Sequence, residues 1–270
     1  MGLIDMADQG LVQRFATRIT GTGAKTVMFA HGFGCDQAMW RYVAPAFERD
    51  FRVVLFDFVG AGSSDLSVYD PENYASLAGY ADDVVALAKA LGINDGIFVG
   101  HSVSGMIGIL ASKQAPELFG KLVLVGPSPR YINDADYTGG FTAEQIEELL
   151  DFLDSNHMGW SQAMAPVIMG NPDRPELGEE LTNSFCRTDP EIAKRFARAT
   201  FLSDNRSDLP GIDAEVLILQ CRSDAIAPIE VGEHVHRAIA GSRLVILDAT
   251  GHCPNLSAPE ETIAAIKAFV

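Results

Sequence analysis

Short apolar runs alternate with helix-length amphipathic segments along most of this chain. The runs are rich in Val, Ile, Leu and Phe and occupy residues 26–30, 52–56, 97–99, 121–125, 216–220 and 244–247. The segments between them, residues 74–91 among others, repeat apolar side chains with the period of a helix. Near-continuous apolar strands that alternate with helices are typical of a mostly parallel sheet covered by helices on both faces. The sequence therefore predicts an α/β fold with a doubly wound sheet.

The alternation stops after residue 125 and resumes only after about residue 210. Helix start signals, including a capping box at Thr142 and a proline at position 190, predict four helices near residues 142–154, 157–169, 175–187 and 190–202. A helical insertion between two strands of one sheet is most simply a cap over its edge. We therefore predict a core domain of residues 1–126 and 211–270 and a cap of residues 127–210. The more polar residues 11–20 are predicted to form an edge strand.

Composition excludes several classes of protein and partner. The 270 residues are 47% hydrophobic and 21% charged, which indicates a globular chain. The chain has 20 basic and 36 acidic residues, and the resulting net charge of −16 opposes binding to nucleic acid or anionic lipid. Residues 1–10 lack a signal-peptide pattern and nowhere do 18 apolar residues run together. We therefore expect a cytoplasmic protein with no membrane partner.

Neither the four cysteines nor the glycine-containing loop that begins at Asp57 predicts a bound metal or cofactor. Cys35, Cys186, Cys221 and Cys253 lie far apart without a C-x-x-C pair, which favours reduced thiols and no metal site. The loop that begins at Asp57 lacks the third glycine and the helix of a dinucleotide fingerprint. We expect these features to serve packing and turns.

The strongest catalytic signal lies where a predicted strand turns into a predicted helix. The run at residues 97–99 continues into GHSVSGM at positions 100–106. This segment resembles the nucleophile elbow of the α/β-hydrolase fold, which lifts a serine hydroxyl above the sheet. Ser102 is therefore the predicted nucleophile. The common pattern G-x-S-x-G has glycine where this chain has Ser104, but the helix needs only a small side chain there.

A serine nucleophile needs a base, and the base needs an orienting carboxylate. In this fold the carboxylate and then the histidine follow the serine, each at the end of a later strand. Asp224 follows the run at residues 216–220, and His252 follows the run at residues 244–247. We assign these two residues to the triad. Asp248, at the end of the histidine's own strand, is the rival carboxylate.

Acyl transfer also requires hydrogen-bond donors for the oxyanion. The sequence HGFG at positions 31–34 follows the run at residues 26–30 and matches the oxyanion loop of the fold. The backbone N–H groups of Phe33 and Val103 are the predicted donors. Loss of one such donor typically lowers the rate roughly 10²–10³-fold.

Five segments together resemble the RsbQ-like branch of the α/β hydrolases. They are FAHGFGCDQ at 29–37, VGHSVS at 99–104, LVGPSP at 124–129, YIND at 131–134 and GHCP at 251–254. That branch contains the bacterial stress regulator RsbQ and the plant karrikin and strigolactone receptors. The resemblance runs from about residue 29 to the C-terminus. It implies an α/β-hydrolase fold, no cofactor, and a V-shaped four-helix cap inserted after the sixth strand over a hydrophobic pocket.

By position in the resembling segments, the pocket around Ser102 is expected to include Phe33, Phe141, Trp160, Met164 and Phe201. An apolar pocket suits a small hydrophobic ester or lactone. One predicted function is a serine esterase or lactonase that forms an acyl-enzyme. The alternative is a signalling protein that slowly hydrolyses such a ligand to regulate a protein partner. Haloalkane dehalogenases and epoxide hydrolases of this fold are disfavoured, because they carry Asp at the elbow where this chain has Ser102. A cofactor-free oxygenase or haloperoxidase is a further alternative.

Overall fold

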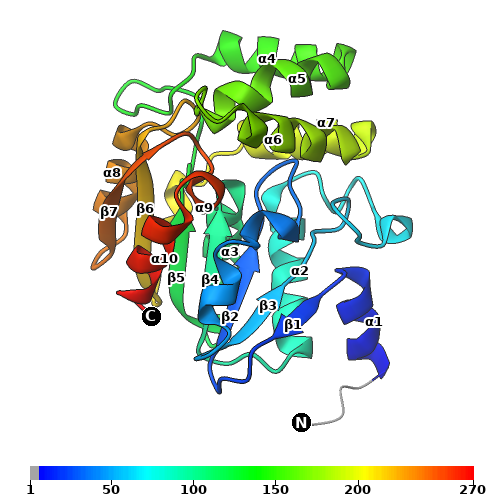
Figure 1. Ribbon diagram of the computed structural model, residues 1–270, viewed down its shortest axis with the longest axis vertical. Coiled ribbons are helices and arrows are strands. Elements are labelled where there is room, and N and C mark those ends of the chain that lie inside the picture. Colours follow the sequence, from blue (N-terminus) through cyan, green and yellow to red (C-terminus); the bar gives the residue numbers. More distant parts are fainter. Residues whose placement is uncertain (1–5) are drawn as a thin grey trace.

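A seven-stranded sheet forms the centre of the computed structural model, which describes residues 6–270 (Figure 1). Its strand order is β1-β3-β2-β4-β5-β6-β7, with β1 antiparallel to β3 and all other neighbours parallel. The strands are β1 (Arg18–Thr20), β2 (Thr26–Ala30), β3 (Arg52–Leu55), β4 (Gly96–His101), β5 (Phe119–Val125), β6 (Glu215–Ser223) and β7 (Arg243–Thr250). The sheet predicted from the alternating runs is confirmed. The predictions that concern residues 1–5, on a signal peptide and on the start of the core domain, lie outside the described residues.

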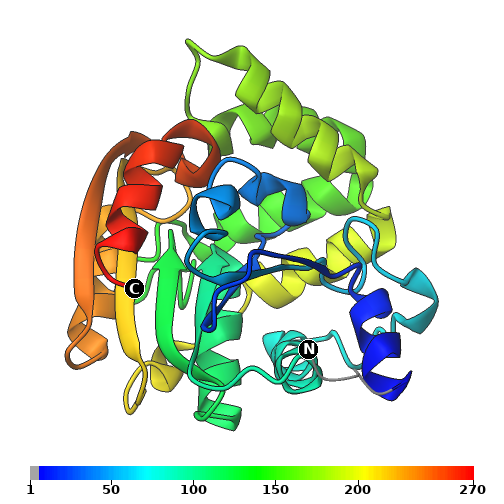
Figure 2. The same cartoon turned by 60° about the horizontal axis from the view of Figure 1, so that its bottom comes forward.

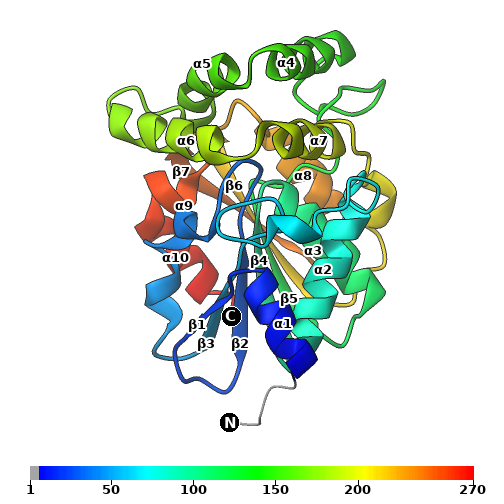
Figure 3. The same cartoon turned by 90° about the vertical axis from the view of Figure 1, so that its right-hand side faces the viewer.

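Helices cover both faces of this sheet (Figure 3). One face carries α2 (Leu77–Ala90), α3 (Val103–Gln114) and α8 (Ile229–Ala238), and the other carries α9 (Pro254–Ser257) and α10 (Pro259–Lys267). Successive strand residues point to opposite faces, so that Val27 and Phe29 of β2 join one core cluster and Met28 joins the other. Short 3₁₀ turns are η1 (Gln37–Trp40), η2 (Ala44–Phe47), η3 (Leu66–Val68) and η4 (Arg206–Asp208). In the described part of the chain, no helix has the length and apolar character that a bilayer crossing requires.

The first part of the chain differs from the predicted edge strand over residues 11–20. Helix α1 (Met6–Arg14) takes up its first half and lies beside α2 (Figures 2 and 3). Phe15 is fully buried, and Ala16 has a φ of 44°, a left-handed conformation that ends the helix. Only Arg18–Thr20 then pair with β3 as a strand. The prediction was wrong because Leu11 and Val12 pack from a helix, and so short a segment carries no clear period.

Four helices separate β5 from β6 and lie above the carboxyl ends of the strands (Figures 1 and 3). They are α4 (Ala143–Ser155), α5 (His157–Met169), α6 (Pro175–Arg187) and α7 (Pro190–Phe201). Thr142 and Gln145 form the predicted capping box of α4, and Pro190 opens α7. The insertion follows the fifth strand rather than the expected sixth, because within residues 6–270 only β1 precedes β2. The exact division into a core domain and a cap domain stays a prediction.

Aromatic side chains pack α7 against the core. Tyr80 of α2 stacks on Phe196 of α7 with 4.4 Å between ring centroids, and Phe196 in turn meets Phe33 at 5.7 Å. Tyr74 also packs against Tyr80, with 4.9 Å between ring centroids, and its hydroxyl donates a hydrogen bond of 2.7 Å to Asp83 Oδ2. The loop after β2 is therefore connected to α2 through side chains of the inserted helices.

Asp83 makes the stability of this region depend on pH. Burial raises the pKa of its carboxyl from 3.8 to about 6, although the Tyr74 hydroxyl opposes the shift. A carboxyl whose pKa is raised by folding stabilises the protein below its unfolded pKa, and this contribution is lost as the pH rises through the folded value. A rise from 3.8 to about 6 corresponds to about 3 kcal/mol. Between pH 4.5 and pH 7, wild-type stability is therefore expected to fall by about 2 kcal/mol of this total relative to Asp83→Asn.

Urea denaturation of both proteins at pH 4.5, 5.5 and 7.0 measures this difference. Asp82→Asn is the matched control, because Asp82 is the adjacent carboxylate on α2 and is exposed. We expect that control to follow the wild-type pH dependence closely. A constant offset between wild type and Asp83→Asn over the whole range would show that Asp83 does not titrate in this way.

Candidate active site

Ser102 sits in a strained turn at the carboxyl end of β4. Its φ of 56° and ψ of −123° are unusual for a residue with a side chain. The Ser102 N–H donates to the carbonyl of Val125 at 2.8 Å, and the Ser102 carbonyl accepts from the N–H of Gly105 at 2.8 Å. A Cβ at Gly100 would lie 2.4 Å from the carbonyl oxygen of Ser104, so this close turn requires glycine there. These contacts hold the serine above the sheet.

Ser104 occupies the position where the common elbow pattern has glycine. Its side chain is fully buried, and its hydroxyl donates to the carbonyl of His31. The small side chain fits against the strand, as the sequence analysis required. Its hydroxyl also ties the elbow to the loop that follows β2.

A continuous pair of hydrogen bonds connects the predicted triad residues. His252 Nε2 lies 2.7 Å from Ser102 Oγ, and His252 Nδ1 lies 2.7 Å from Asp224 Oδ2. A carboxylate only accepts hydrogen bonds, so Nδ1 carries the proton and Nε2 is free to accept from the serine. All three side chains are shielded from solvent. This arrangement can remove a proton from the serine hydroxyl.

The loop after β6 fixes the orientation of Asp224. Its Oδ1 accepts backbone hydrogen bonds from Ile226 at 2.8 Å and Ala227 at 3.1 Å, which leaves Oδ2 for the histidine. Asp248, the alternative carboxylate, points away from His252. Its side chain is 83% exposed and pairs with Arg222 at 2.9 Å. Of the two carboxylates considered, only Asp224 contacts His252.

The side chains of two further histidines, to which the sequence analysis assigned no role, hydrogen-bond to backbone near the site. His101 Nε2 lies 2.7 Å from the carbonyl of His252. Burial lowers the pKa of His101 to about 3, so His101 is neutral and donates from Nε2. Burial also lowers the pKa of His31, whose Nε2 accepts the Phe58 N–H at 3.1 Å. Both imidazole rings are neutral and connect neighbouring backbone segments through hydrogen bonds.

The predicted oxyanion donors flank Ser102. Val103 is the first residue of α3, where backbone N–H groups and the helix dipole favour negative charge. Phe33 lies in the loop after β2, and a Cβ at its neighbour Gly32 would lie 3.4 Å from Ser102 Cβ. The structure thus brings both backbone segments next to the serine.

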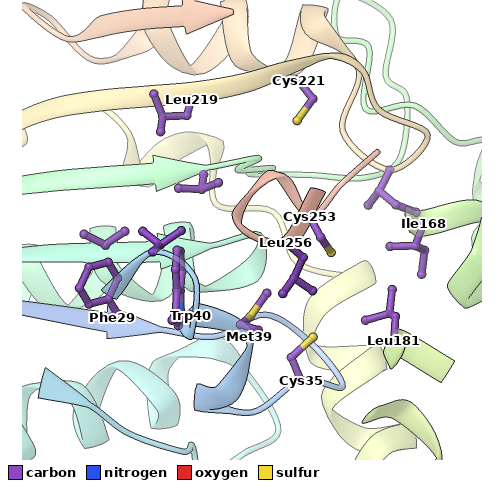
Figure 4. Packing of buried hydrophobic residues seen from close by; sticks show 14 of the residues in the cluster. Phe29, Cys35, Met39, Trp40, Ile168, Leu181, Leu219, Cys221, Cys253 and Leu256 are labelled. Atoms are coloured by element: carbon purple, nitrogen blue, oxygen red, sulfur yellow. The ribbon is translucent and has the colours of Figure 1, made fainter. Parts of the chain in front are cut away.

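A small cavity of about 30 Å³ lies over Ser102 and His252. That volume is room for one or two water molecules. Its walls come from the core and the inserted helices, and Figure 4 shows part of them, where Cys35, Cys253, Ile168 and Leu181 converge. Burial raises the pKa of the Cys35 thiol to about 12 and that of Cys253 well above its usual value, so both thiols are protonated. All four cysteines of the chain are free.

The lining only partly matches the predicted pocket. Phe33 and Phe201 line the cavity, whereas Phe141, Trp160 and Met164 do not. Trp160 is buried behind Phe33, at 5.9 Å between ring centroids, and Phe141 and Met164 pack against the core cluster while half-buried. The correction has a geometric cause. Helices α6 and α7 lie between the sheet and α4–α5, so α5 reaches the cavity only through Ile168 near its end (Figure 1).

The cavity includes residues that the sequence analysis did not assign to it. They are Cys35, His101, Tyr131, Ile168, Leu181, Phe185, Thr200, Ile226 and Cys253. Leu181 and Phe185 are four residues apart on α6, a spacing that marks one face of a helix. Tyr131 lies in one of the family-like segments, which was the signal available for it. Nothing in the local sequence marks Thr200.

The α5–α6 junction is bonded directly to the loop that carries His252. The His252 N–H donates to the Ile168 carbonyl at 2.8 Å. Asn171 Nδ2 donates to the carbonyls of Met169 at 2.6 Å and Thr250 at 2.8 Å. Arg174 donates to Ser257 O at 2.9 Å and to Asn171 Oδ1 at 2.7 Å. We call these contacts the histidine-loop clasp, because they fix the backbone on both sides of His252.

Comparison with known proteins identifies the family. The profile of the Alpha/beta hydrolase family matches residues 27–265. Karrikin insensitive 2 receptor CA of Petunia hybrida is 37% identical over 98% of this chain and 96% of its own length. Strigolactone esterase D14 of Arabidopsis thaliana is 37% identical over 95% of this chain and 96% of its own.

Among solved structures, a hydrolase from Oleispira antarctica is 41% identical and superposes with a TM-score of 0.95 over 97% of this chain and 96% of its own. These relatives confirm the resemblance drawn from the five sequence segments. The sheet order and the turn that carries Ser102 agree with the same assignment. The chain belongs to the α/β hydrolase family.

Proposed function

We propose that the protein is a serine hydrolase that cleaves a small hydrophobic ester or lactone. The observation that carries this proposal is the Ser102–His252–Asp224 chain of two 2.7 Å hydrogen bonds at the floor of the cavity. A serine, a histidine and a buried carboxylate joined in this order are the elements of acyl transfer. The esterase name carried by the Arabidopsis relative supports the reaction class.

The mechanism follows from the positions of these atoms. Ser102 Oγ attacks the substrate carbonyl while His252 Nε2 takes its proton, and Asp224 stabilises the resulting imidazolium. The N–H groups of Phe33 and Val103 donate to the oxyanion. His252 then protonates the departing alcohol, which leaves an acyl group on Ser102. Water attacks this acyl-enzyme with His252 as base, and the acid is released.

The walls of the cavity support this substrate class. Most of the side chains around Ser102 are apolar, and none of the described lining residues is Lys, Arg, Asp or Glu. A charged acyl or alcohol group would therefore lose its hydration without a counter-ion. The free space above Ser102 is small, about 30 Å³, so a bulky ester would require side chains of the lining to move.

Hydrolysis of p-nitrophenyl acetate and of a butenolide lactone, with intact-protein mass recorded during turnover, tests the proposal. We expect product release, and a transient mass increase equal to the acyl group. After proteolysis, this increase should map to the peptide that contains Ser102. An adduct that maps only to another residue, or turnover without sensitivity to a serine-directed phosphonate, would contradict the mechanism.

A second proposed function is a ligand-reporting protein that hydrolyses its ligand slowly and regulates a protein partner. Two observations favour it, namely the receptor relative that matches 98% of this chain and the small size of the cavity. The same experiment separates the two functions. Turnover at about 1–10³ per second is typical of metabolic enzymes. An adduct that persists for minutes would favour the reporting role.

A further inference from the structure

Two hydroxyl groups in the cavity wall have no hydrogen-bond partner among the described residues. They are Tyr131 Oη and Thr200 Oγ1, and each side chain is only 1% exposed. Both residues line the cavity above Ser102. Buried polar groups are normally hydrogen-bonded, so each such group needs an explanation.

The surroundings of these hydroxyls are otherwise apolar. Phe33, Phe185 and Phe201 share the same wall, and the Tyr131 ring packs edge-on against Phe201 with 5.0 Å between centroids. Burial raises the pKa of the Tyr131 phenol, and Tyr131 and Ser102 line the same cavity. A purely apolar ligand would leave both hydroxyls without hydrogen bonds and so bind less well.

His101 Nδ1 is the other unpartnered polar atom of the lining. It faces the loop after β2, where a Cβ at Gly32 would lie only 2.5 Å away. That backbone leaves no room for a ligand atom. Apart from the reacting groups and the weakly donating thiols of Cys35 and Cys253, Tyr131 and Thr200 are therefore the described lining side chains able to hydrogen-bond a substrate.

We propose that Tyr131 and Thr200 form a polar subsite that binds a second, neutral oxygen of the substrate. The inference rests on the proposed hydrolase function and narrows its substrate class. The preferred substrate is a small ester or lactone with an additional ether, carbonyl or ring oxygen close to the scissile bond. An anionic oxygen is excluded, because none of the described lining residues is Lys or Arg.

Matched ester pairs that differ by one oxygen test this subsite. The first pair, p-nitrophenyl methoxyacetate and p-nitrophenyl butyrate, exchanges O for CH₂ in the acyl part. The second pair, 2-methoxyethyl acetate and butyl acetate, does so in the alcohol part. The measured quantity is the ratio of kcat/KM between the members of each pair, because intrinsic differences in reactivity are the same for every variant.

In at least one pair, Tyr131→Phe and Thr200→Val are each expected to lower the oxygen-to-carbon ratio about tenfold, and the double variant about 100-fold. Both substitutions retain side-chain volume. Tyr137→Phe is the matched control, because the Tyr137 hydroxyl donates to Arg130 O at 2.7 Å and Tyr137 does not line the cavity. Its ratios are expected to equal those of wild type.

A binding measurement keeps the subsite testable if the hydrolase mechanism fails. Calorimetric titration of the same pairs into Ser102→Ala, and into Ser102→Ala combined with Tyr131→Phe and Thr200→Val, gives the affinity ratio without turnover. A ratio that falls at least tenfold supports the subsite even if wild type hydrolyses neither ester. Ratios that stay within twofold in both kinetics and binding overturn it and leave the hydroxyls as ligands of water.

Discussion

Asp224→Asn is expected to lower kcat about 10³–10⁴-fold with little change in fold. Asparagine keeps the shape of the side chain, and its carbonyl oxygen can still accept from the N–H groups of Ile226 and Ala227. The atom facing His252 Nδ1 then becomes an amide NH₂, which only donates. The histidine must shift its proton to Nε2, where it can no longer accept from Ser102. In other serine hydrolases, replacing the triad aspartate by asparagine fixes the histidine in the wrong tautomer and lowers kcat by about 10⁴-fold.

Asp248→Asn is the matched control for this prediction. Asp248 is exposed and pairs with Arg222, so its neutralisation is expected to change kcat less than twofold. Steady-state kinetics on p-nitrophenyl acetate, with circular dichroism to verify folding, measure both variants. The assignment of the orienting carboxylate would be reversed if Asp248→Asn lost activity and Asp224→Asn kept it.

Gly251→Ala is expected to be the most damaging single-methyl substitution near the site. Gly251 has a φ of 89°, and a Cβ there would lie 1.7 Å from the carbonyl oxygen of Met169. The histidine loop and the end of α5 would have to separate, which would displace His252. We expect a loss of about 3–4 kcal/mol in unfolding free energy and at least about a 100-fold loss in kcat.

Gly241→Ala separates the backbone effect from the clash. Gly241 has a similar φ of 76°, but a Cβ there meets no atom within 4 Å. It is expected to cost about 1–2 kcal/mol of unfolding free energy, with kcat unchanged. Thermal denaturation and kinetics on both variants make the comparison. Equal losses of stability and full activity in Gly251→Ala would show that the loop can shift away from α5 freely.

The triad residues were predictable because each follows its own strand. A strand end and a nearby glycine mark Ser102 and His252 in the printed sequence, a strand end alone marks Asp224, and the structure brings all three side chains into contact. The starts of α4 and α7 were predictable for a similar reason, since caps and prolines act within one turn. Local chemistry was sufficient for both.

The pocket lining was not predictable in the same way. Whether Trp160 or Phe185 faces Ser102 depends on which pair of inserted helices lies nearer the sheet, and amphipathic faces alone do not determine that stacking. The histidine-loop clasp was also missed, because Asn171 and Arg174 bond to backbone carbonyls, which are present at every residue. The prediction for residues 11–20 failed for a related reason, because the partly buried Leu11 and Val12 of α1 fit a helix or a strand equally well.

The histidine-loop clasp has a consequence for protein engineering. Lids of enzymes are often deleted or exchanged to widen access, on the assumption that the remaining core keeps its catalytic groups in place. Here the His252 N–H and the Thr250 carbonyl both bond to residues 168–171. A chimaera with a foreign lid would therefore need to retain the segment from Ile168 to Arg174 to keep the histidine in register. Directed evolution of specificity is better aimed at α6 and α7, whose side chains face the cavity without holding that loop.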